Sequence, residues 1–144
     1  MKLLTVKELQ ARIAEVEGAK ASAALKAQHA EEEEKRALLE RLTKPSGLSD
    51  DEIMEKASII INRAVENGQM SVQVFRFPHS LCTDNGRAIN QAEAGWETTL
   101  TGIPREIYEF WKRQLQPRGY HIRYETINYP GGMPGDVGII LSWG

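Results

Sequence analysis

The sequence is poor in the side chains that bind metals and form disulfides: it has one cysteine, Cys82, and three histidines, His29, His79 and His121. A single thiol cannot close a disulfide within the chain or supply the several thiolates of a Cys-rich zinc site. The histidines fall in separate predicted elements, without the close spacing of a metal-binding motif. We therefore expect no disulfide framework, no metal ion and no other cofactor.

Neither sign of charge is in excess. The formal net charge is −2 at pH 7. Residues 1–44 carry nine Lys or Arg against eight Asp or Glu, and the remainder carries nine against twelve. Because an electrostatically bound nucleic acid requires a basic surface, we expect no nucleic-acid partner.

Long apolar runs are also missing. No stretch approaches the roughly 18 apolar residues that a membrane-spanning helix needs, so we expect no membrane partner. At the N-terminus, Lys7 and Glu8 interrupt the apolar stretch before the core of a signal peptide could form. We expect no secretion by a signal peptide.

What the sequence does contain is a long run of helix-forming residues at its N-terminal end. Thr5 and Glu8 have the spacing of a capping box, and Gly18 is the single glycine or proline before Pro45. This composition predicts one helix from near Thr5 to Leu42. Since Pro45 and Gly47 end it, we expect an N-terminal helical arm, 1–44, and a separate domain, 45–144.

The apolar residues of this arm have the spacing of a coiled-coil seam. Leu9, Ile13 and Val16 recur at intervals of four and three, and small or charged residues continue the track: Lys20, Ala23, Ala27, Ala30, Glu34 and Ala37. Three interpretations stay open: a coiled coil or bundle with further copies, a helix packed on another protein, and a helical spacer. In the first two, the contact residues are Leu9, Ile13 and Val16.

Residues 45–144 predict a small α+β domain of two layers, with a three-stranded sheet and helices on one face. We expect helices from Ser49 to Asn67 and from Pro104 to Pro117, and a short helix at 88–92. The buried stripe of the first of these helices is predicted as Ile53, Ala57, Ile60, Ile61, Ala64 and Val65.

The predicted strands of this sheet are 70–77, 120–129 and 137–143. In the first, the alternation places Val72 and Val74 on one face, and Phe75 and Phe77 on the other. The second and third strands are expected to pair antiparallel, with the first strand beside them.

The long segment 79–102 contains the one grouping that resembles a nucleophilic site. His79, Cys82 and Asp84 lie close in sequence, but catalytic Cys–His pairs usually come from distant segments. We favour a buried cysteine and a turn-forming aspartate, with Trp96 and Leu100 as the apolar anchors of the segment.

The glycine-rich loop 130–135 joins two predicted strands. A phosphate-binding loop joins a strand to a helix N-terminus, so this loop does not fit that function. A shaped contact surface is the better interpretation, with Met133 as its candidate interaction residue.

Four short segments carry a resemblance: 64–68 (AVENG), 71–74 (SVQV), 119–122 (GYHI) and 139–143 (IILSW). From Ile60 onward the chain resembles small structural proteins of bacteriophages and prophages. The resemblance implies a virion or assembly component and no catalytic residues. It also implies localisation in a virion or in the bacterial cytoplasm.

Together these features predict a non-enzymatic structural or assembly protein. Its expected partners are further copies of itself or other assembly proteins, bound through the N-terminal helix. Two alternatives stay open: a regulatory adaptor that binds a partner protein, and a small enzyme with a site in 79–102.

Overall fold

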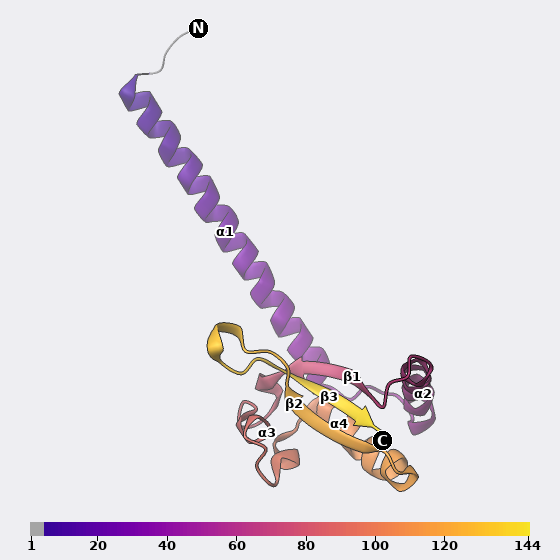
Figure 1. Cartoon of the computed structure of the whole chain (residues 1–144). Coiled ribbons are helices and arrows are strands. Elements are labelled where there is room, and N and C mark those ends of the chain that lie inside the picture. The colour runs from indigo at the N-terminus through magenta and orange to yellow at the C-terminus, as the bar shows by residue number, and fades with distance from the viewer. Residues whose placement is uncertain (1–4) are drawn as a thin grey trace. The chain divides into compact units, whose positions relative to one another are not determined.

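The computed structural model describes residues 5–144, so the first four residues of the predicted arm lie outside the described part. The chain divides into two compact units, one ending at Leu38 and the other running from Leu39 to Gly144 (Figure 1). The second unit therefore includes the end of the first helix as well as the predicted domain.

The first helix, α1 (Val6–Thr43), is a single helix of 38 residues. Its N-terminus has the predicted capping box, since the Glu8 amide donates to the Thr5 hydroxyl and the Thr5 amide donates to the Glu8 carboxylate. Every side chain from Thr5 to Ala37 is exposed. This stretch therefore gains no stability from burial within its own unit.

The second unit is built on a three-stranded sheet of β1 (Ser71–Pro78), β2 (His121–Thr126) and β3 (Asp136–Ser142). The order is β1-β3-β2, and both pairings are antiparallel. The last strand is thus the central one, which explains why Val137–Leu141 are buried without alternation. The predicted α+β class and three-stranded sheet are confirmed, although β2 ends at Thr126, before the predicted limit at Tyr129.

The predicted faces of β1 were wrong. A register shift between Gln73 and Phe75 inserts an extra residue into this strand. Val72 therefore pairs with Leu141, and Phe75 and Phe77 pair with residues on the same side of β3, Ile139 and Val137. The bulge brings Val72, Phe75 and Phe77 onto one face, where simple alternation had separated them.

The helices of the second unit are α2 (Asp50–Glu66), α3 (Arg87–Asn90) and α4 (Gly102–Phe110), which Figure 1 labels. Their apolar side chains pack on this inner face of the sheet. Leu141 lies in a cluster with residues of α2 and of the α4 region: Ile61, Phe110 and Leu115. Val137 and Ile139 lie in a second cluster with residues of the 79–102 segment: Leu81, Cys82, Ile89 and Leu100. The sheet and helices form the two predicted layers.

Two helix predictions need correction. The exposed fraction of Val65 is 52%, so this residue lies outside the buried stripe of α2. Helix α4 begins at Gly102, before the predicted start at Pro104. Gly102 has a positive φ of 58° and lies close to the backbone of Leu42. Beyond Phe110 the helix widens into a π-helical turn, η3 (Trp111–Leu115).

The 79–102 segment contains more helix than the sequence predicts. Besides α3, it forms the 3₁₀ turns η1 (His79–Leu81) and η2 (Trp96–Thr99). Leu100 is buried, and Trp96 packs against the same cluster, which confirms both as anchors. The long connection is therefore a part of the core.

Within residues 5–144, no helix combines the length and the hydropathy that crossing a membrane requires.

Candidate interaction surface

The seam of α1 is a row of exposed apolar side chains. The exposed fractions are 46% for Leu9, 57% for Ile13 and 48% for Val16. Residues three and four apart share a helix face, so these side chains form one stripe. Val6, which is 69% exposed, precedes Leu9 by three residues and extends the stripe by one position. Val6 was not among the contact residues predicted from sequence, although it has the same spacing.

The stripe fits a heptad pattern. Val6 and Ile13 take position a, and Leu9 and Val16 take position d. Beyond Val16 the stripe is thinner: charged residues occupy position a at Lys20 and Glu34, and alanines fill the remaining positions: Ala23, Ala27, Ala30 and Ala37. Leu25, also exposed at 67%, falls at position f on the opposite side of the helix. The concentrated apolar surface of α1 is therefore confined to its first half.

Met133, the fourth predicted contact residue, belongs to the second unit. It is 69% exposed and follows the short turn Pro130–Gly132. Two hydrogen bonds hold the ends of this loop: the Asp136 amide donates to the Asn128 side-chain oxygen at 2.6 Å, and the Tyr129 hydroxyl donates to the side-chain oxygen of Asn90 in α3 at 3.0 Å. Met133 is thus a separate candidate contact, presented by a fixed loop.

The His79, Cys82 and Asp84 grouping has structural roles. The carboxylate of Asp84 accepts hydrogen bonds from the amides of Gly86 at 3.0 Å and Ala88 at 2.9 Å, at the start of α3. His79 Nδ1 lies 3.1 Å from the Gly135 carbonyl oxygen. Because a carbonyl only accepts, Nδ1 carries the proton and links η1 to the loop before β3.

Cys82 lies in the core, with an exposed fraction of 3%. Burial raises the pKa of its thiol, and a hydrogen bond with the Thr99 side chain opposes this effect only in part. The protonated thiol is a poor nucleophile. This environment matches the buried structural cysteine that the sequence favoured.

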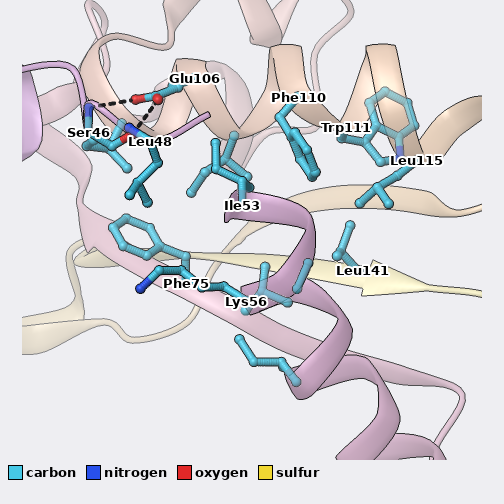
Figure 2. A pocket seen from close by; sticks show the side chains of 15 residues that line it. Ser46, Leu48, Ile53, Lys56, Phe75, Glu106, Phe110, Trp111, Leu115 and Leu141 are labelled. Atoms are coloured by element: carbon cyan, nitrogen blue, oxygen red, sulfur yellow. Dashed lines mark hydrogen bonds between the residues drawn. The ribbon is translucent and has the colours of Figure 1, made fainter. Parts of the chain in front are cut away.

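The second unit contains an apolar cleft of about 240 Å³ between α2, α4 and the sheet (Figure 2). Its wall is formed mainly by aliphatic and aromatic side chains, among them Leu48, Ile53, Phe75, Phe110 and Trp111. No sequence signal indicated it, because its wall comes from five separate segments of the chain.

Two charged residues line this cleft, Lys56 and Glu106. The Glu106 carboxylate accepts hydrogen bonds from the Ser46 amide, at 3.1 Å, and from the Ser46 hydroxyl. It therefore fixes the linker after α1. The cleft has the surface to hold an apolar group, without a nucleophile or an acid–base pair.

The three histidines stay apart from one another. His29 pairs with Glu33 on α1, His79 lies in η1, and His121 is exposed on β2. The part of the chain that the structure describes holds no group of three or more His, Cys, Asp or Glu placed to bind a metal ion.

Comparison of the chain with protein-family models, with curated proteins and with solved structures gave no match. The resemblance to bacteriophage structural proteins therefore stays a prediction from sequence.

Proposed function

We propose that this protein is a non-enzymatic assembly protein that docks through the seam of α1, to further copies of itself or to another assembly protein. The observation that carries the proposal is the stripe of Val6, Leu9, Ile13 and Val16 on a helix whose side chains are all exposed as far as Ala37. A partner surface would supply the burial that this helix lacks.

The expected gain is substantial for so short a stripe. Full burial of a Val, Leu or Ile side chain stabilises a complex by roughly 1.5–3 kcal/mol, and these side chains are each half to two-thirds exposed. Covering all four would contribute several kcal/mol, before the cost of association. Since α1 gains no stability from burial as far as Ala37, part of this gain would appear as protection of its backbone hydrogen bonds.

A structural role is also supported by the state of the nucleophile-like residues. Cys82 is buried as a thiol, His79 is held by the Gly135 carbonyl, and Asp84 caps α3. We place the assembly in a phage virion on the strength of the sequence resemblance alone. Capsid or tail genes beside the gene for this protein would support that placement.

The experiment is to measure the mass of the full chain by light scattering over a wide concentration range, together with amide hydrogen exchange in residues 6–37. Ile13→Asp puts a charge on the seam, and we expect it to abolish association and to increase exchange in α1. Leu25→Asp is the matched control, because it removes an apolar residue of comparable exposure from the opposite side of the same helix.

A monomer at every concentration, with freely exchanging amides in α1, would contradict self-association. It would favour the adaptor alternative, in which α1 becomes ordered only on another protein. Equal effects of the Ile13 and Leu25 variants would also contradict the proposal, because they would show that the seam is not the contact.

A further inference from the structure

We propose that the partner of the α1 seam is a second copy of the same helix, arranged as a parallel, in-register, two-stranded coiled coil. This inference rests on the proposed function and names its partner. Position a holds the β-branched residues Val6 and Ile13, and position d holds Leu9 and then Val16. β-Branched residues at a with leucine at d favour two parallel strands.

The charges beside the seam support the same arrangement. In a parallel pair, position g of one helix faces position e of the other, five residues further along. Arg12 at g then faces Glu17 of the second copy, and Lys26 at g faces Glu31 of the second copy. Symmetry repeats each contact, so four attractive pairs form. The ion pairs within residues 5–144 all involve other residues, which leaves these four side chains available.

These charges also discriminate against the other arrangements. An antiparallel pair sets e against e and g against g, so Glu17 and Glu31 at e no longer face Arg12 and Lys26 at g, and the four attractive contacts are lost. A parallel pair that slips by one heptad loses all four attractive contacts and sets Glu33 against Glu31 of the second copy. Like charges at such positions are destabilising. The in-register parallel pair is the arrangement in which every charged g–e contact is attractive.

The same heptad assignment predicts a weak dimer. Lys20 and Glu34 occupy position a, where each would face its own copy, and the later d positions are alanines. A charged a position lowers the stability of a coiled coil while it helps to define the register. The g–e pairs are exposed, so salt should weaken the dimer further.

Disulfide formation tests the orientation and register. Ala37→Cys places a thiol at position d near the end of α1, where a parallel, in-register pair brings it against itself. Ala11→Cys places one at position f, which faces away from the second helix. Both are made in the full chain with Cys82→Ala, and again with the buried Cys82 retained in case its loss impairs folding. In a glutathione redox buffer, we expect a covalent dimer from Ala37→Cys and little from Ala11→Cys.

Charge reversal provides a test that needs no cysteine. Arg12→Glu with Lys26→Glu makes the four contacts repulsive, and we expect the dimer dissociation constant to rise about tenfold or more. Glu17→Arg with Glu31→Lys should weaken self-association in the same way. Mixing the two double variants should restore a mixed dimer, because each contact then joins opposite charges.

The outcomes separate this inference from the proposed function. A dimeric mass with equal cross-linking at both cysteine positions would overturn the parallel register and leave docking through the seam intact. A mass of three or four chains would overturn the two-stranded form. A monomer that is unaffected by Ile13→Asp would overturn both proposals.

Discussion

At the residue scale, Tyr124 combines burial, aromatic packing and a hydrogen bond at the centre of the domain. It is 7% exposed, and its hydroxyl donates to the Pro104 carbonyl at 2.7 Å. Three rings surround it, those of Phe77, Trp96 and Tyr108, with centroid separations of 6.1, 5.0 and 6.3 Å. It therefore joins β2 to α4 and to the 79–102 segment.

The substitution Tyr124→Phe keeps the ring and removes this hydrogen bond. We expect the free energy of unfolding to fall by about 1 kcal/mol near neutral pH, as for a typical buried hydrogen bond. Tyr129→Phe is the control, because Tyr129 is 55% exposed and its hydroxyl bonds a surface side chain. Its effect should stay within about 0.5 kcal/mol. Urea unfolding of each variant provides the measurement.

Tyr124 also makes the free energy of unfolding depend on pH, in a direction that follows from its pKa. Burial raises the pKa of Tyr124 above its ordinary value of 10.0. The unfolded chain then loses this proton at a lower pH than the folded chain does. The stabilising contribution is complete below pH 10 and is lost as pH rises further, by up to about 1.4 kcal/mol per pH unit. Tyr124→Phe should lack this loss, so an equally steep decline in that variant would contradict the prediction.

At the element scale, Gly102 allows the start of α4 to approach the end of α1. Its φ of 58° lies in the left-handed region. A Cβ atom at this position would overlap the Leu42 carbonyl oxygen and come within 2.8 Å of the Thr43 Cα atom. All three residues belong to the second unit, so this contact is part of the domain itself.

We expect Gly102→Ala to lower the free energy of unfolding of the domain by about 2–4 kcal/mol, the sum of backbone strain and a displaced neighbour. Gly18→Ala is the matched control, since no atom lies within 4 Å of a Cβ built there. It should raise the helix content of α1, because alanine is favoured over glycine by about 1 kcal/mol in a helix. Urea unfolding and circular dichroism measure the two effects. A Gly102 variant within about 0.5 kcal/mol of the parent would contradict the prediction.

The elements that the sequence predicts well are those with local signals. The Thr5–Glu8 and Ser49–Glu52 capping boxes give the starts of α1 and α2, because both partners of each box lie within one turn. The faces of β1 could not be predicted in this way, because its bulge is defined by pairing with β3, about sixty residues later. The close approach of Gly102 to Leu42 likewise has no local signal, because the two residues are remote in sequence.

The same distinction between local and long-range signals applies to the candidate site. The stripe of Leu9, Ile13 and Val16 follows from spacing within one helix, so the sequence was sufficient to find it. The apolar cleft depends on segments as distant as Leu48 and Leu141, and no local pattern marks it. Likewise, the structural role of His79 depends on Gly135, 56 residues away.

At the scale of the whole molecule, α1 is one helix that belongs to two compact units. The sequence places the boundary at Pro45–Gly47, where the helix ends. The second unit instead begins at Leu39, and Leu39 and Leu42 pack against the cluster that contains Val137 and Ile139. The end of the helix is therefore part of the folded domain, although no local break in sequence marks the change.

Two fragments test whether the folded domain begins at Leu39 or at Pro45. The fragment 39–144 keeps Leu39 and Leu42, so it should unfold with nearly the same free energy as the domain within the full chain. The fragment 45–144 loses both half-buried leucines, and we expect its free energy of unfolding to be lower by about 1–3 kcal/mol. Both fragments lack the α1 seam and should be monomeric, so association cannot obscure the comparison. Equal stability of the two fragments in urea would show that the folded domain begins at Pro45, and that the end of α1 contributes nothing to its core.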